Sequence, residues 1–362
     1  MRLCERKFLL TKLIMERLIR PSILDITPYN AKPIPCRVKL DIMESPYDLP
    51  PGIKSKIKDA VQRIHFNLYP DPEASTLKEG LADYTGVSPD MILVGNGSDE
   101  LILYLLLCFG GEGRRTIFPE PTFSMYSTLA KITGTESYPV PLGEGFELND
   151  SRIIDRAKEK PSIVFIAYPN NPTGDCFKRD KVLRIIKETD SLVVIDEAYY
   201  EFSKESFVAD LSAYKNLVIL RTFSKAFGLA ALRCGYLMAN AEVISWLNKV
   251  RLPYNLNSLS QEIAVILLAE KAWMEKITGE IICQRDWLYN ELLKVKGIKP
   301  YQSKTNFIYF ETDNPCKVYA RLLADGILIK QVAAGLRVTI GKPEENQEFL
   351  DKLIILAKQE LS

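Results

Sequence analysis

An amine, two hydroxyl groups and a guanidinium lie close together in the stretch RTFSKAFGLAALRCGY, residues 221–236. Lys225 follows Thr222 and Ser224, and Arg233 stands eight residues further on. An amine condenses with an aldehyde to form an imine, while hydroxyl groups and a guanidinium bind an anionic group beside it. Pyridoxal phosphate carries both an aldehyde and a phosphate, so these residues predict a site for it. If Lys225 and Arg233 are considered alone, the alternative is that Lys225 is a solvated loop lysine and Arg233 is a surface charge.

A buried strand is expected directly before these residues. The run NLVIL, residues 216–220, is continuously apolar, which is typical of a strand buried on both faces. Thr222, Ser224 and Lys225 then fall on the loop past its carboxyl end. Open α/β sheets bind their ligands at that edge.

Two further strand ends place polar groups at the same edge. In SLVVIDEAYY, Asp196 ends a strand and Tyr199 follows three residues later. A buried carboxylate keeps a pyridine nitrogen protonated, and a phenol can donate to the 3-oxygen of the ring. In YPNNPTG, after the strand SIVFIA, the Asn171 amide can reach the same oxygen. Taken alone, Asp196 could instead cap the next helix and Asn171 could belong to a simple turn.

A glycine-rich strand end and a late arginine complete the candidate set. GNGSDELILYLLL begins at Gly95, and the backbone amides of Ser98 and Asp99 at its helix start suit a phosphate. A plain N-cap at Ser98 is the alternative. Arg337 of LRVTIG could bind a carboxylate through two parallel hydrogen bonds, or be a surface charge.

Composition excludes several classes of protein. The 362 residues contain 47 Lys plus Arg against 46 Asp plus Glu, so no nucleic-acid partner is expected. The seven scattered cysteines form no CxxC pair, which indicates free thiols in a reducing compartment and no metal site. The only histidine, His65, is expected to be structural or on the surface. No apolar run reaches the roughly 18 residues of a membrane span, and we expect a cytoplasmic protein.

The chain is expected to have two domains of different class. Seven β-rich runs between residues 91 and 240 alternate with helical segments, which predicts an α/β fold with a mostly parallel, seven-stranded sheet. They are MILVGN, TIF, ESYPV, SIVFIA, SLVVID, NLVILRT and CGYLMA. Later helical periodicity and the strands TNFIYF, GILIK and LRVTIG predict a smaller α+β domain. We expect an N-terminal arm at 1–45 that joins the small domain and a dimer contact, a large cofactor-binding domain at 46–250 and a small domain at 251–362.

The candidate residues resemble, in order and spacing, those of the fold-type-I pyridoxal-phosphate aminotransferases. Within that family the chain is most similar to the histidinol-phosphate aminotransferases. The similarity extends over nearly the whole chain after residue 20. It rests on TPY, LYPDPEA, GNGSDE, PEPTFSMY, YPNNPTG, DEAYYEF, RTFSKAFGLAALRCGY, VRLPYN, TNF and LRVTIGKPEEN.

The resemblance implies how pyridoxal 5'-phosphate would be held. Lys225 would form the imine and shuttle a proton between the substrate α-carbon and the cofactor. Asp196 would pair with the pyridine nitrogen. The ring oxygen and ring face would be contacted by Asn171, Tyr199 and Phe123. The phosphate would be bound by Ser98, Asp99, Thr222, Ser224, Arg233 and, from a partner subunit, Tyr69, which implies a homodimer with shared sites.

The resemblance also implies a substrate. Arg337 would bind the substrate carboxylate, with Tyr29 and Asn306 lining the same pocket. The family reaction transfers an amino group between L-glutamate and imidazole-acetol phosphate, giving L-histidinol phosphate in histidine biosynthesis. An aromatic amino-acid aminotransferase or a threonine-phosphate decarboxylase of the same fold is the alternative, and a non-catalytic binding protein is the alternative from another class.

Two segments depart from the family pattern. The family's NENP appears as MESP, residues 43–46, at the rim of the site. In GILIKQVAAGLRV, Lys330 stands where the family usually has an arginine, and the interval to Arg337 is several residues short. The loop expected to wrap the substrate phosphate is therefore truncated. A lysine supplies positive charge without the bidentate fork, which can lower activity or shift the substrate.

Overall fold

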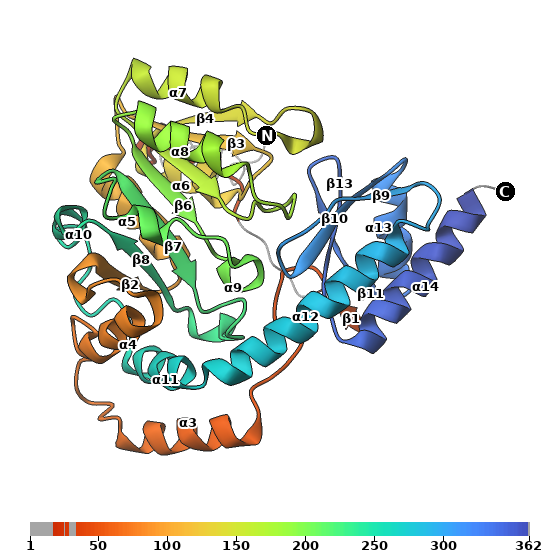
Figure 1. Cartoon of the computed structure of the whole chain (residues 1–362), viewed down its shortest axis with the longest axis horizontal. Coiled ribbons are helices and arrows are strands. Elements are labelled where there is room, and N and C mark those ends of the chain that lie inside the picture. The colour runs from red at the N-terminus through yellow and green to blue at the C-terminus, as the bar shows by residue number, and fades with distance from the viewer. Residues whose placement is uncertain (1–16, 25, 29–33, 361–362) are drawn as a thin grey trace, which may run out of the picture.

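A seven-stranded sheet forms the centre of the larger of two lobes (Figure 1). The computed structural model describes residues 17–24, 26–28 and 34–360. The strand order is β2-β8-β7-β6-β5-β3-β4, and only β8 runs antiparallel to its neighbours. The strands are β2 Ile92–Gly95, β3 Arg115–Glu120, β4 Glu136–Pro141, β5 Ser162–Ala167, β6 Leu192–Asp196, β7 Leu217–Thr222 and β8 Gly235–Ala239. The predicted seven-stranded, mostly parallel sheet is confirmed.

Both faces of this sheet are covered, as its continuous apolar runs require. Along β5, Val164 and Ile166 pack into one hydrophobic core, and Ile163 and Phe165 pack into the other. Side chains alternate between the faces of a strand, so a run without polar residues fits only a sheet that is buried on both sides. The surrounding helices are α2 Pro21–Leu24, α3 Pro51–Arg63, α4 Ser75–Thr85, α5 Ser98–Phe109, α6 Met125–Thr133, α7 Asp150–Glu159, α8 Arg179–Glu188, α9 Tyr200–Ser203, α10 Ala241–Leu247 and α11 Ser258–Ala269.

The smaller lobe is built on an antiparallel sheet with the order β12-β13-β10-β9. Its strands are β9 Ile298–Pro300, β10 Phe307–Thr312, β12 Lys330–Val332 and β13 Gly335–Thr339. Its helices are α12 Lys271–Leu292, α13 Pro315–Ala324 and α14 Pro343–Glu360. Helix α12 leads from the larger lobe into the smaller one (Figure 1). The helical periodicity at 259–295 is two helices, α11 and α12, separated at Glu270.

The N-terminal arm lies against the smaller lobe. Strand β1, Val38–Lys39, pairs in parallel with β11, Ile327–Leu328. The Thr339 amide donates to the Leu40 carbonyl at 2.9 Å, and the Met43 amide donates to the Thr339 hydroxyl at 3.0 Å. Through these contacts the arm reaches the space between the lobes. The domain limits at 45 and 250 stay a prediction, and α11 beyond the second limit packs on α3 and α4.

Short 3-10 helices occupy several connections between these elements. They are η1 Pro89–Met91, η2 Glu144–Phe146, η3 Val208–Asp210 and η4 Ala230–Leu232. Among the helices of the described residues, none is both long and apolar enough to cross a lipid bilayer.

Candidate active site

The carboxyl ends of β5, β6 and β7 meet at one edge of the large sheet, and their loops line a single pocket. Asp196 is in register with Ala167 on one side and Leu220 on the other, so the three strands end side by side. The pocket has a volume of about 590 Å³ including its open mouth. It is lined by Met43, Ser98, Asp99, Phe123, Ala167, Pro169, Asn171, Asp196, Ala198, Tyr199, Thr222, Ser224, Lys225 and Arg233. The structure therefore brings all of the residues predicted to bind the cofactor, except Tyr69, into one place.

Asp196 is buried at the base of this pocket, with 5% of its surface exposed. One carboxylate oxygen, Oδ2, accepts from the Tyr126 hydroxyl at 2.7 Å, and Oδ1 accepts from the Ala198 amide at 3.2 Å. Burial raises the pKa of Asp196 to about 6, and the two hydrogen bonds oppose that rise. A carboxylate in this setting can bind a protonated ring nitrogen.

A chain of hydrogen bonds links the smaller lobe to the sheet edge. The Arg337 guanidinium donates from Nη1 to Asn171 Oδ1 at 2.5 Å, and Asn171 Nδ2 donates to the Tyr199 hydroxyl oxygen at 3.3 Å. Arg337 Nη2 donates to the Asp41 carbonyl at 3.0 Å, while its Nε is buried without a partner among the described residues. A buried guanidinium N–H without an acceptor is costly, so an anionic acceptor at this position would stabilise Arg337.

Lys225 Nζ donates to the Ile42 carbonyl at 3.3 Å. Loss of hydration around the amine, together with the positive charge of Arg337, lowers the pKa of Lys225 to about 8. Lys225 thus carries a substantial fraction of neutral amine near neutral pH. A neutral amine is the form that attacks a carbonyl carbon.

Hydroxyl groups and a guanidinium form an anion cradle beside Lys225. Thr222 donates to Ser224 Oγ at 3.0 Å, and Arg233 Nη1 donates to the same oxygen at 3.4 Å. Arg233 Nη2 also pairs with Asp99 at 3.1 Å, at the start of α5. Gly97 has φ +85°, which favours glycine, and a Cβ there would lie 2.7 Å from Arg233 Nη2 and displace that guanidinium. The cradle needs glycine at this point.

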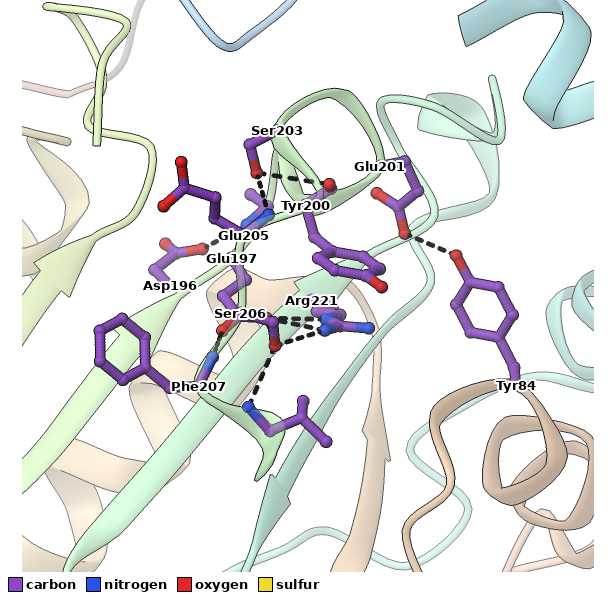
Figure 2. Close-up of polar contacts among 12 residues, drawn as sticks. Tyr84, Asp196, Glu197, Tyr200, Glu201, Ser203, Glu205, Ser206, Phe207 and Arg221 are labelled. Carbon is purple, nitrogen blue, oxygen red and sulfur yellow. Dashed lines mark hydrogen bonds and ion pairs between the residues drawn. The ribbon is translucent and has the colours of Figure 1, made fainter. Parts of the chain in front are cut away.

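A buried ion pair joins the end of β6 to β7 (Figure 2). Arg221 donates to Glu197 Oε2 from Nε at 3.0 Å and from Nη2 at 2.8 Å. The other oxygen of Glu197 accepts from the Phe207 amide at 2.7 Å, and Ser206 donates to Oε2 at 2.9 Å. Glu197 follows Asp196 and Arg221 precedes Thr222, so the pair fixes the two strand ends that carry site residues.

Comparison with known proteins identifies the family. Residues 37–353 match the model described as aminotransferase class I and II. The chain belongs to the class I and II aminotransferases. The histidinol-phosphate aminotransferase of Caldanaerobacter subterraneus subsp. tengcongensis is 40% identical over 347 residues, which cover 94% of this chain and 99% of that protein. The histidinol-phosphate aminotransferase of Aquifex aeolicus is 41% identical over 346 residues, covering 93% and 97%.

Solved structures of such enzymes share the fold of this aminotransferase. The histidinol-phosphate aminotransferase of Sinorhizobium meliloti, in complex with pyridoxal-5'-phosphate, gives a TM-score of 0.86 at 22% identity and covers 94% of this chain and 98% of that chain. The L-threonine-O-3-phosphate decarboxylase of Porphyromonas gingivalis gives a TM-score of 0.77 at 24% identity, covering 89% and 99%. The fold is therefore common to both reaction types, and it does not distinguish them.

Four predicted residues of the described part of the chain lie apart from the pocket lining, namely Arg337, Asn306, Lys330 and Tyr69. Asn306 is buried between the arm and β10 and donates to the Met43 carbonyl at 3.1 Å. Lys330 lies on the edge strand β12, in register with Arg337 of β13. Tyr69 is 80% exposed and stacks on Tyr254 at 4.5 Å. Tyr29 lies outside the described residues.

The sequence prediction missed Tyr126, Glu197 and Arg221. Each adjoins a motif that was recognised: Tyr126 follows Phe123 by three residues in PTFSMY, Glu197 follows Asp196 and Arg221 precedes Thr222. Charged residues at the buried ends of apolar strands are rare unless they are paired. That signal could have identified the ion pair.

Proposed function

We propose that this aminotransferase uses pyridoxal 5'-phosphate to transfer an amino group between L-histidinol phosphate and 2-oxoglutarate in histidine biosynthesis. The observation that carries the proposal is that Lys225, Asp196 and the Arg233 cradle open into one pocket. The relatives named histidinol-phosphate aminotransferase, 40% and 41% identical over almost the whole chain, support this substrate.

The residues present fit the cofactor. When bound, pyridoxal phosphate supplies a ring that accepts the electron pair left when the substrate α-carbon loses a proton. Asp196 would accept a hydrogen bond from the protonated pyridine nitrogen, and Phe123 would cover one face of the ring. Asn171 and Tyr199 would donate to the ring oxygen. The cradle of Thr222, Ser224 and Arg233, with the Ser98 and Asp99 amides, would bind the phosphate.

Lys225 and Arg337 act on the substrate. The Lys225 amine would hold the cofactor and would also carry the α-carbon proton. Arg337 binds the α-carboxylate, since its Nε has no partner among the described residues. The buried Asn306 Oδ1 is also unpaired within residues 34–360 and offers an acceptor in the same region. Tyr29 is proposed to line this pocket as well.

We propose that Lys330 contacts the far end of the substrate. Directly opposed residues of antiparallel strands point to the same face of a sheet, so Lys330 and Arg337 share a face. The shortened loop between them is a tight hairpin turn after Val332, with Ala333 at φ +51°. Arg337 is buried and Lys330 is exposed, so Arg337 lies toward the interior of the protein and Lys330 lies at its surface. We assign Lys330 to the substrate phosphate.

The lowered pKa of Lys225 predicts how cofactor-free protein combines with pyridoxal phosphate. Since only the neutral amine reacts, the rate should rise about tenfold per pH unit below the pKa and level off above pH 8. Stopped-flow absorbance across pH 6 to 11 measures this rate. Arg337→Gln should move the midpoint upward, because the Arg337 charge contributes to the shift. A midpoint near 10.5 in the unmodified protein would contradict the assignment.

The substrate assignment predicts turnover of L-histidinol phosphate with 2-oxoglutarate, and little or none with phenylalanine or threonine phosphate. Lys330→Met should raise the KM for histidinol phosphate about tenfold, the effect of one partly exposed charged hydrogen bond, and leave the glutamate half-reaction unchanged. Lys296→Met, next to β9 at the opposite edge of the same sheet, is the matched control. Absence of histidinol phosphate turnover would exclude the proposed substrate.

The enzyme is proposed to be a cytoplasmic homodimer. Phe66, Leu68 and Tyr69 are 73%, 63% and 80% exposed, an aromatic and aliphatic patch typical of an interface. Tyr69 would reach the cofactor phosphate of the partner subunit from this patch. The cysteines of the described residues are free thiols, which supports a reducing compartment.

A further inference from the structure

We propose that Tyr126 is a positioning residue for the cofactor, whose hydroxyl holds the Asp196 carboxylate toward the pyridine nitrogen and whose ring supports Phe123. The inference rests on the proposed use of pyridoxal phosphate. Tyr126 does not line the pocket, so it acts through these two neighbours.

Ring contacts fix the place of Tyr126. It lies in the first turn of α6 and is completely buried. Its ring stacks on Phe165 of β5, with centroids 4.8 Å apart and planes 12° from parallel, and it meets Phe123 edge to face at 5.6 Å. Such aromatic pairs contribute about 0.5–1.5 kcal/mol beyond area burial. A ring held on two sides gives the hydroxyl little freedom to move.

The hydroxyl then determines the orientation and charge of Asp196. With Oδ2 held by Tyr126 at 2.7 Å and Oδ1 by the Ala198 amide, the carboxylate plane is fixed. The hydrogen bond from Tyr126 also lowers the pKa of Asp196, against burial and against the negative charges of Asp99 and Glu197. Tyr126 therefore keeps Asp196 ionised near neutral pH, the form that pairs with a protonated ring nitrogen.

Tyr126→Phe tests this role, because it removes one oxygen and keeps the ring. Spectroscopic titration of cofactor-free protein should show pyridoxal phosphate bound about tenfold more weakly, the loss of one hydrogen bond to a charged group. The pH midpoint of the visible absorbance of bound cofactor should move upward. With Asp196 less ionised, the ring nitrogen carries less positive charge. Because that charge disfavours protonation of the Lys225 nitrogen, its loss raises the pKa of the Lys225 nitrogen and moves the midpoint upward.

Tyr84→Phe is the matched control. Tyr84 donates to the buried carboxylate of Glu201 at 3.2 Å (Figure 2), and neither residue lines the pocket. This variant should lose stability and leave both the cofactor affinity and the absorbance midpoint unchanged. If Tyr126 had only a structural role, Tyr126→Phe would likewise lose stability and leave the cofactor affinity and the absorbance midpoint unchanged.

A double-mutant cycle separates action through Asp196 from general damage. In an Asp196→Asn background, Tyr126→Phe should change cofactor affinity little, because the carboxylate it acts through is absent. Equal effects in both backgrounds, or an unchanged affinity and midpoint in Tyr126→Phe, would overturn the inference. If the unmodified protein itself shows no visible cofactor absorbance, the proposed function fails instead.

Discussion

Lys225→Ala should reduce transamination by at least about 10⁴-fold, because it removes both the covalent attachment of the cofactor and the proton carrier. Among the described residues, no other lysine lines the pocket. The measurements are the glutamate half-reaction and the visible absorbance of the protein with added pyridoxal phosphate. The variant should still bind the cofactor through the Arg233 cradle and Asp196, but without the absorbance of a covalent link.

Lys225→Arg is the matched control for charge. A guanidinium keeps the positive charge next to the Ile42 carbonyl but does not condense with an aldehyde at neutral pH. It should be as inactive as the alanine variant. Activity within tenfold of the unmodified enzyme in either variant would show that Lys225 is not the reacting amine.

Mixing subunits extends this test to the proposed dimer. If the partner's Tyr69 completes each site, a hybrid of Lys225→Ala and Tyr69→Ala subunits has one complete site. Random pairing of equal amounts should then restore activity at about one quarter of the sites. No recovery after mixing, with subunit exchange confirmed by mass spectrometry, would contradict a shared site.

The part of the pocket formed by residues that follow apolar strands could be predicted from the sequence. Asn171, Asp196 and Lys225 each come after such a run, and parallel neighbouring strands end at the same edge of a sheet. Pattern and topology are then sufficient to bring them together. The same argument located the strands that are short apolar runs, such as β5, β6 and β7.

The rest of the site depends on contacts between distant segments. The Lys225 amine donates to Ile42, 183 residues earlier, and Arg337 donates to Asn171, 166 residues earlier. No local sequence motif predicts either of these contacts between distant residues. Tyr126 is a helical aromatic among other buried aromatics, so its pattern indicates only core packing. Its role follows from the 2.7 Å contact with Asp196.

Arg221→Met should lower the free energy of unfolding by about 3–5 kcal/mol, since it leaves the Glu197 carboxylate buried without its cation. Glu197 has no exposed surface and Arg221 is 3% exposed, so water cannot replace the lost contacts. The guanidinium also lies 3.5 Å from the ring centre of Tyr200. Urea unfolding of the cofactor-free protein at fixed concentration measures the loss, and Lys54→Met, which breaks the exposed pair with Asp48, should cost far less.

The loss in Arg221→Met should also depend on pH. Burial raises the pKa of Glu197 in the folded protein, and Arg221 opposes that rise. Without Arg221 the folded pKa is higher still. The folded state then keeps a proton that the unfolded chain releases above its ordinary pKa of about 4.3. Stability is retained below that pH and falls as the pH rises toward the folded pKa.

Replacing both partners, in Glu197→Gln with Arg221→Met, should recover much of the stability, because no unpaired charge remains. A double variant as unstable at pH 8 as Arg221→Met alone would show that the guanidinium acts by packing against Tyr200 and not by neutralising Glu197.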